Sequence, residues 1–181
     1  VSHDLKTPLA RLRFGFEMLE EAPTPEQARR YLARIDEDLS AMENLITRLL
    51  DYAKLEEGQI KLDFQPLDLN PLLQRLSEPW SDGANSLQLQ LHKTPCVIAA
   101  DPQYLMMLIN NLLSNAQRYA KGQIRISTRV LTDAVELSIE DNGPGIEPDH
   151  YQQVLKPFVR GQTDGLAGHG MGLAIVERIA S

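Results

Sequence analysis

The sequence predicts an α+β chain, in which a long antiparallel hairpin of two helices precedes a domain that mixes strands and helices in layers. Up to Ala53 the apolar residues recur at steps of three and four, which is the period of a helix. From Gln59 they alternate within short runs, which is the period of a strand. Because the period changes where a helix ends, we expect two domains, over residues 1–57 and 58–181, without a long linker.

Two apolar seams define the helices of the hairpin. Between them Thr24 is placed to cap the second helix, Pro25 to open it, and Gly58 to end it. Each seam is too narrow to be buried in a lone hairpin, so we expect dimerisation into a four-helix bundle. The alternative is that the hairpin packs on the rest of its own chain. The seams comprise Leu5, Leu9, Leu12, Phe16 and Leu19, then Leu32, Ile35, Leu39, Met42, Ile46, Leu49 and Ala53.

The second domain opens with Ile60, Leu62 and Phe64, whose alternation predicts a strand that Pro66 ends. The remaining expected elements are a helix from Asp68 to about Trp80, strands over 87–91 and 96–100, a helix capped by Asp101 and opened by Pro102 that runs to about Tyr119, strands over 123–130 and 134–141, and a helix from near Gly172.

The totals restrict the class of function. The formal net charge of -7 argues against general binding to a nucleic-acid backbone. Cys96 is the single cysteine and cannot form an internal disulfide, so we expect a reducing compartment. The sequence holds no apolar run of about 20 residues that could span a membrane. It begins inside a motif and stops inside a helical pattern, so we expect a fragment of a longer protein.

Residues 2–9 read Ser-His-Asp-Leu-Lys-Thr-Pro-Leu at the head of the first helix. His3 and Thr7 lie one turn apart on one helix face, and Asp4 follows His3 directly. A single histidine on a helix is usually a solvated surface group. The interpretation of His3 as a phosphate acceptor therefore depends on three candidate nucleotide-site elements further along the chain.

The first element is a helix face. Asn111 and Asn115 project together, with Arg118 and Tyr119 one turn beyond, while the apolar residues occupy another face. Carboxamide oxygens suit Mg²⁺, and a guanidinium offers a planar fork of donors to phosphate. The alternative is a plain solvated face, although two asparagines lower the helix propensity.

The second element is Asp-Asn-Gly-Pro-Gly over residues 141–145. Asp141 continues the parity of the apolar residues of its strand, so we expect its carboxylate on the buried side, where it could accept from an adenine amine. Gly143 and Gly145 would let the backbone approach the ring. The alternative is a simple turn that Asp141 caps.

The third element is a glycine-rich run over residues 168–172 that opens the last helix. Free N–H groups at a helix start favour phosphate, although most such runs are turns. We interpret residues 159–167, which follow Phe158, as a mobile lid over the nucleotide, with an ordinary surface loop as the alternative.

In this order the motifs resemble those of the bacterial two-component sensor histidine kinases. Ser-His-Asp-Leu-Lys-Thr-Pro-Leu is similar to the H box of that family, and Asn-Leu-Leu-Ser-Asn-Ala-Gln-Arg-Tyr to its N box. Asp-Asn-Gly-Pro-Gly, Lys-Pro-Phe and Gly-His-Gly-Met-Gly-Leu resemble its first glycine box, F box and second glycine box. The resemblance covers nearly the whole chain, and it implies an ATP-binding α/β sandwich of the histidine kinase, Hsp90 and MutL type, truncated at the C-terminus.

The resemblance also implies roles for matching residues. His3 would be the nucleophile, Asp4 its base or orienting carboxylate, and Thr7 the residue that positions water in a phosphatase reaction. The nucleotide site would use ATP with Mg²⁺. Its residues would be Asn111, Asn115, Arg118, Tyr119, Asp141, Gly143, Gly145, Gly170 and Gly172, of which Asn115 would ligate the metal and Arg118 stands where the family usually has lysine.

The partners implied are a second copy of the chain, through the hairpin, and the receiver domain of a response regulator, which accepts the phosphoryl group on an aspartate. The implied location is the cytoplasmic portion of an inner-membrane sensor, whose membrane segments lie outside this sequence. Two other functions remain open from the residues: an ATPase of the same fold without a phosphoacceptor, and a non-enzymatic dimerising scaffold with a decayed nucleotide site.

Overall fold

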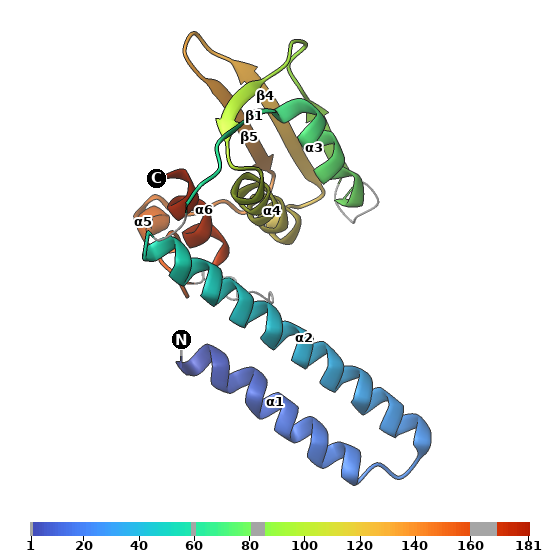
Figure 1. The fold of residues 1–181 in the computed structure, drawn as a ribbon. Coiled ribbons are helices and arrows are strands. Elements are labelled where there is room, and N and C mark those ends of the chain that lie inside the picture. The colour runs from blue at the N-terminus through green and yellow to red at the C-terminus, as the bar shows by residue number, and fades with distance from the viewer. Residues whose placement is uncertain (1, 59–60, 81–85, 160–169) are drawn as a thin grey trace.

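The structure, a computed structural model, describes residues 2–58, 61–80, 86–159 and 170–181, with only the backbone at residues 2–5 and 80. Helices α1 (Ser2–Glu20) and α2 (Pro25–Glu56) run antiparallel as a long hairpin (Figure 1). The Thr24 hydroxyl accepts a hydrogen bond from the Gln27 N–H at 3.3 Å. Gly58 follows α2 at φ +60°, a left-handed conformation that suits glycine. The predicted hairpin and its capping residues are confirmed.

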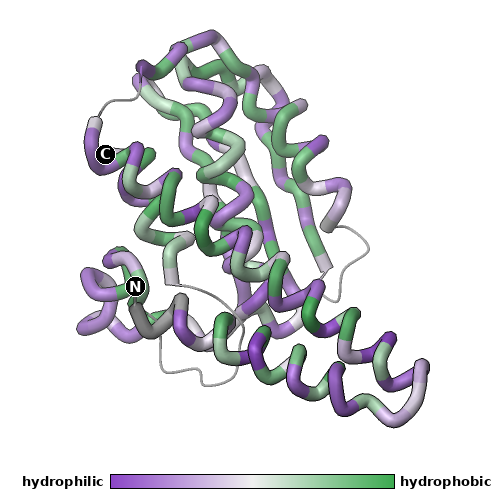
Figure 2. Tube along the Cα trace, turned by 60° about the horizontal axis from the view of Figure 1, so that its bottom comes forward, coloured by the Kyte–Doolittle hydropathy of each residue, from purple (hydrophilic) through white to green (hydrophobic). Residues whose placement is uncertain are grey.

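The hairpin buries only part of its apolar surface. Leu12, Ile35 and Leu45 are buried, and α1 approaches α2 closely at Gly15, where an added Cβ would lie 2.8 Å from Ile35 Cγ1. Hydrophobic and hydrophilic residues both recur along α1 and α2 (Figure 2). Within one chain, part of each seam therefore remains exposed, namely Leu9, Phe16, Leu32, Leu39 and Ile46. Phe14 and Leu50, which lie outside the seams, are exposed as well.

The second domain contains two small sheets. In the larger sheet β4 lies in the centre, parallel to β2 and antiparallel to β5. In the smaller sheet β1 and β3 pair antiparallel. The strand bounds are β1 (Gln65–Asp68), β2 (Ser86–Gln90), β3 (Val97–Ala100), β4 (Gln123–Val130) and β5 (Val135–Asp141).

Helices α3 and α4 supply the apolar layer that covers the larger sheet, β2-β4-β5, which is mixed. The core joins Leu69, Leu72 and Leu73 of α3 to Ile109 and Leu113 of α4, and it includes Cys96 and Ile126. Helix α6 packs against α4 and also against α2, so it lies between the hairpin and the rest of the second domain (Figure 1). The helix bounds are α3 (Leu69–Ser77), α4 (Pro102–Tyr119), α5 (Tyr151–Val154) and α6 (Gly172–Ala180), with short 3₁₀ helices at Glu78–Trp80 and Pro148–His150.

The predicted first strand of this domain is wrong. Residues 61–64 have no regular structure and Phe64 is 63% exposed, while Gln59 and Ile60 lie outside the described residues. The strand is β1 instead, and it contains Pro66, which was expected to end a strand. Since β1 pairs with β3 on one side only, a residue without an N–H is tolerated there.

Asp101 illustrates how local chemistry stabilises this domain. Its carboxylate accepts hydrogen bonds from the backbone N–H of Asp63 at 2.9 Å, and from those of Gln103 and Tyr104 in the first turn of α4. The bond from Asp63 and the two cap bonds hold the pKa of Asp101 below its ordinary 3.8.

We expect Asp101→Ala to lower the stability of the protein at neutral pH, because α4 loses its cap. A lowered pKa in the folded state contributes stability that is present above the ordinary value of 3.8 and is lost as the pH falls through the lower folded value. The gap between the urea midpoints of the two proteins should therefore narrow in acid. A gap that stayed constant down to the lowest measurable pH would contradict this account.

Candidate functional site

The predicted phosphoacceptor residues lie in the first two turns of α1. The backbone of His3 and Asp4 is helical, and the Thr7 side chain is exposed. Pro8 stands inside the helix, and it lacks the N–H that would otherwise bond the carbonyl of Asp4. Thr7 borders a groove of about 600 Å³ between α1 and α2.

The hairpin register places His3 along α2. Gly15 of α1 lies against Ile35 of α2, and the two helices run antiparallel with the same rise per residue. His3 stands twelve residues before Gly15, and Thr47 stands twelve residues after Ile35. His3 is therefore level with Thr47 and Arg48 of α2.

The predicted carboxamide face of α4 lies beside the start of α6. Asn111 is buried at 8% exposure, while Asn115, Arg118 and Tyr119 are partly exposed. A Cβ added to Gly172 would lie 3.3 Å from the Asn111 Oδ1 atom and 3.8 Å from the Asn115 Oδ1 atom. The first and third predicted elements therefore meet, with two carboxamide oxygens facing the first residue of α6.

The second element also joins α4, but not as predicted. Asp141 is exposed rather than buried, and its Oδ1 accepts from the Gly143 N–H at 2.7 Å, which is the capped turn left open as the alternative. Strand parity failed here because β5 ends at Asp141, where nothing covers the side chain among the described residues. An added Cβ on Gly143 would clash with the Tyr119 carbonyl oxygen, so this glycine is needed for close approach of the turn to α4. Gly145, at φ +73°, meets no such contact.

The role of Asn142 in this turn was not predicted from the sequence. Its Oδ1 accepts hydrogen bonds from the N–H groups of Lys121 and Gln123, at 2.8 and 3.1 Å, and its Nδ2 donates to the Lys121 carbonyl. Asn142 thus fixes the connection between α4 and β4. The asparagine-glycine pair signalled a turn but not this distant partner.

Gly170 joins the third element to the segment that contains Phe158. The Phe158 N–H donates to the Gly170 carbonyl at 2.9 Å, and both residues have left-handed φ angles, of 66° and 65°. A Cβ on Gly170 would lie 2.6 Å from the Val159 carbonyl oxygen. Only glycine fits this position without a shift of the backbone. The predicted lid falls, apart from Val159, outside the described residues.

We expect Gly170→Ala to distort this corner of the site. The left-handed backbone and the contact with Val159 both oppose a side chain, at a cost of about 1–3 kcal/mol for the backbone strain alone. Nucleotide affinity, measured by calorimetry, should fall while the far-UV circular dichroism stays close to that of the parent. Gly58→Ala provides a control for the backbone strain, because Gly58 is also left-handed, at φ +60°, while its added Cβ meets nothing within 4 Å. Equal nucleotide affinity in Gly170→Ala and the parent would refute this expectation.

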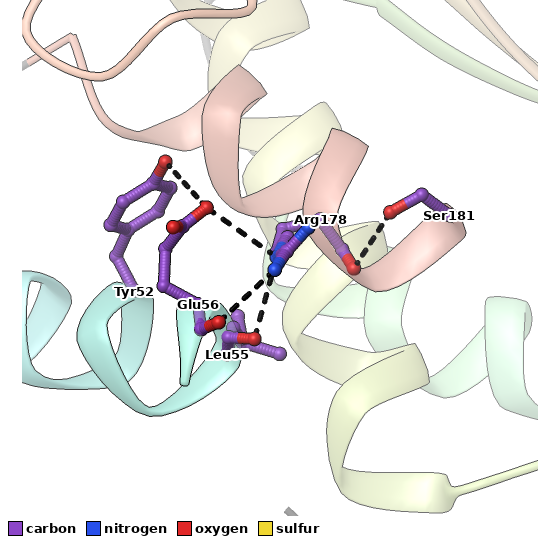
Figure 3. Close-up of polar contacts among 5 residues, drawn as sticks. All are labelled: Tyr52, Leu55, Glu56, Arg178 and Ser181. Carbon is purple, nitrogen blue, oxygen red and sulfur yellow. Dashed lines mark hydrogen bonds and ion pairs between the residues drawn. The ribbon is translucent and has the colours of Figure 1, made fainter. Parts of the chain in front are cut away.

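Among the described residues, two arginines make polar contacts between the hairpin and the second domain, and neither was predicted. Arg48 of α2 donates from Nη1 to the Asn111 Oδ1 atom at 3.1 Å. Arg178 of α6 donates to the carbonyls of Leu55 and Glu56 at the end of α2, and its Nε lies 3.6 Å from a Glu56 carboxylate oxygen (Figure 3). The Tyr52 hydroxyl donates to the same carboxylate. These contacts hold α4 and α6 against the C-terminal half of α2.

The arrangement fits a magnesium nucleotide in its donor types. Asn115 offers an oxygen of the hard type that Mg²⁺ prefers, beside the start of α6. Arg118 lies on the same helix face and suits phosphate, and the tight packing at Gly143 and Gly170 leaves backbone rather than side chains around the site. The described residues contain no cluster of three acidic, histidine or cysteine side chains, so phosphate oxygens and water would have to complete the coordination shell.

Comparison with known proteins finds two family models that match this chain. Residues 1–58 match the model of the His Kinase A (phospho-acceptor) domain. Residues 100–181 match the model of the histidine kinase-, DNA gyrase B-, and HSP90-like ATPase. In the part of the chain that the structure describes, no helix is both long and apolar enough to cross a membrane.

Individual relatives agree with these matches. Sensor protein RstB of Escherichia coli (strain K12) is 32% identical over 187 residues, which cover 99% of this chain and 42% of RstB. The crystal structure of full-length ShkA in complex with AMPPNP has a TM-score of 0.74 at 29% identity, over 99% of this chain and 39% of that one. Acinetobacter baumannii histidine kinase AdeS shares the fold, with a TM-score of 0.77 at 24% identity, over 98% of this chain and 85% of that one.

This chain spans less than half the length of the curated relatives it matches. Within that span lie a hairpin that carries His3 and a domain whose carboxamide and glycine elements meet at one place. The two matched domain models account for most of the sequence, on either side of α3. The chain belongs to the sensor histidine kinases and carries the phospho-acceptor and ATPase domains of their catalytic core.

Proposed function

We propose that this chain phosphorylates its own His3 with ATP and passes the phosphoryl group to an aspartate of a response regulator. The observation that supports this most is the contact between Arg48 and Asn111, because it brings the carboxamide face of α4 to the level of His3 on the hairpin. A nucleotide bound to that face would therefore already lie at the height of His3 along the hairpin axis.

The reaction requires one bond to form and one to break at each transfer. The lone pair of a His3 ring nitrogen attacks the γ-phosphorus of ATP, the nitrogen–phosphorus bond forms, and ADP leaves with the electron pair of the oxygen–phosphorus bond. Asp4 orients the ring and takes the proton from its other nitrogen. In the second step a carboxylate oxygen of the regulator attacks the phosphorus, the nitrogen–phosphorus bond breaks, and His3 leaves as a neutral imidazole because Asp4 returns the proton to the ring.

The residues of the second domain hold the nucleotide. Asn115 ligates Mg²⁺, which offsets the negative charge of the phosphates when bound. Asn111 supports Asn115, and Arg118 and Tyr119 contact the nucleotide. Asp141 accepts from the adenine amine, for which its exposed carboxylate would have to be covered by the ring. The glycines at 143, 145, 170 and 172 allow the backbone to approach.

The proposed partners follow from the surface of the hairpin. The exposed apolar residues of both seams, such as Phe16 and Leu39, would be buried in a four-helix bundle with a second copy. The groove that Thr7 borders would receive the regulator, and Thr7 would position water when the reaction runs as a phosphatase. The full-length protein would be an inner-membrane sensor with this core in the cytoplasm.

The proposal is tested by the acid stability of the product. The purified protein is incubated with Mg²⁺ and ATP that is labelled in the γ-phosphate. We expect a label that acid removes and mild base leaves, because a phosphorus–nitrogen bond to imidazole is acid-labile whereas serine and threonine esters are stable in acid. An acid-stable label, or no label with ATP demonstrably bound, would overturn the proposal.

A further inference from the structure

The direction of the hydrogen bond between Arg48 and Asn111 matters for phosphate binding, because Arg48 is the donor. Asn111 donates from Nδ2 to the Met107 carbonyl at 2.9 Å, which fixes its amide nitrogen toward its own helix. Its Oδ1 therefore faces outward and accepts from Arg48 at 3.1 Å. The cation of the hairpin thus lies directly on the first asparagine of the candidate nucleotide face.

Arg48 is also close to a second cation. Burial lowers the pKa of Arg48, the nearby Arg118 lowers it further, and Asp51 on its own helix raises it. Two guanidinium groups, one from each domain, therefore approach each other in a partly buried place. Such an arrangement is favourable when an anion with several oxygen atoms lies between the two groups.

The space beside Arg48 can admit part of such an anion. A cavity of about 260 Å³ lies between α2, α4 and α6, and both Arg48 and Asn111 line it. Most of the other lining groups are polar. The full lining consists of Asn44, Thr47, Arg48, Asp51, Met107, Asn110, Asn111 and Ile175.

We propose that Arg48 is a phosphate-binding residue that the hairpin contributes to the ATP site, and that it binds the terminal phosphoryl group as this group moves to His3. The proposal rests on the proposed function. Arg48 stands level with His3, whereas Arg118 belongs to the domain that keeps ADP. Arg48 donates N–H bonds to the non-bridging oxygens of the γ-phosphoryl group while its bond to ADP breaks and its bond to His3 forms. Stabilisation of charge on those oxygens is how an arginine accelerates phosphoryl transfer.

The test compares Arg48→Ala with Arg30→Ala, which removes the same charge from an exposed position of the same helix. Affinity is measured by calorimetry for ADP and for a non-hydrolysable ATP analogue, and the rate of autophosphorylation is measured separately. In Arg48→Ala we expect affinity for the ATP analogue to fall about tenfold, which is the loss of one charge-assisted hydrogen bond. Affinity for ADP should stay within about twofold, and the rate should fall on the order of 100-fold.

The difference between the two nucleotides distinguishes phosphate binding from a purely structural contact. Loss of a contact that only holds the domains together would change ADP and the ATP analogue in equal proportion, and that result overturns the proposal. Arg48→Lys keeps the charge without the planar fork of the guanidinium. Relative to Arg48→Ala, it should restore part of the higher affinity for the ATP analogue than for ADP, and it keeps the test valid even if Arg48→Ala is poorly folded. A wild-type protein without acid-labile phosphate would overturn the proposed function. Normal wild-type phosphorylation with an unchanged rate in both Arg48 variants would overturn only the role of Arg48.

Discussion

Replacing His3 by glutamine is expected to reduce the uptake of acid-labile phosphate to background. Glutamine keeps hydrogen-bonding groups at this position of α1 but has no nitrogen lone pair that can attack phosphorus. Since His3 lies in the first turn of α1, and Leu12 is the first buried apolar residue among the described side chains, the hairpin should fold normally. Labelling with γ-phosphate-labelled ATP, followed by acid treatment, measures the effect.

The control for this substitution is His150→Gln, at the end of a 3₁₀ helix in the second domain. We expect this variant to be labelled like the parent. Calorimetry should show that His3→Gln still binds the ATP analogue, because the residues proposed to bind the nucleotide lie on the second domain, apart from Arg48, and do not include His3. Labelling of His3→Gln at the parental level would place the acceptor elsewhere and would favour an ATPase without a phosphoacceptor histidine at this position.

Replacing Asn115 by alanine should lower the rate of autophosphorylation on the order of 100-fold, the loss expected when one charge-stabilising group is removed from a catalytic site. Asn115 is the partly exposed carboxamide whose oxygen faces the start of α6. Without that oxygen, Mg²⁺ would lose its protein ligand and the phosphates would lose their position. Asn115 is not in the buried core, so stability to urea should change little.

The matched control is Gln103→Ala, which removes an exposed carboxamide from the first turn of the same helix. Titration with Mg²⁺ distinguishes the loss of a metal ligand from the loss of any carboxamide on this helix. We expect Asn115→Ala to need more Mg²⁺ for half-maximal nucleotide binding, whereas Gln103→Ala should match the parent. An Asn115 variant with parental magnesium dependence and rate would remove this residue from the metal site.

Local signals predicted most of the secondary structure. Thr24 and Pro25 define the start of α2, and Asp101 and Pro102 define that of α4, because caps act over three or four residues and are therefore visible in sequence. The strand predicted from Ile60 to Phe64 failed over its described residues, 61–64, for the opposite reason. Its alternation was real, but no neighbouring strand pairs there, and pairing is decided by distant residues.

The composition of the site was predictable in part, and its contacts were not. Helical spacing placed Asn111 and Asn115 together, and the glycine run was expected near phosphate. Asn111 accepts a hydrogen bond from Arg48, which is 63 residues away and which no motif in the sequence singled out. The exposure of Asp141 depends on where β5 ends and on what covers it. Both belong to tertiary packing, which periodicity in one segment does not encode.

The central claim is that ATP phosphorylates His3, and the most direct test is to locate the phosphate. The sequence has four histidines, at positions 3, 92, 150 and 169. Protein that has been incubated with Mg²⁺ and ATP is digested at neutral to basic pH, and the peptides are fragmented by mass spectrometry. We predict a single phosphorylated residue, His3, whose phosphate is lost after acid treatment. Phosphate on another histidine, or on a serine or threonine that survives acid, would contradict the account.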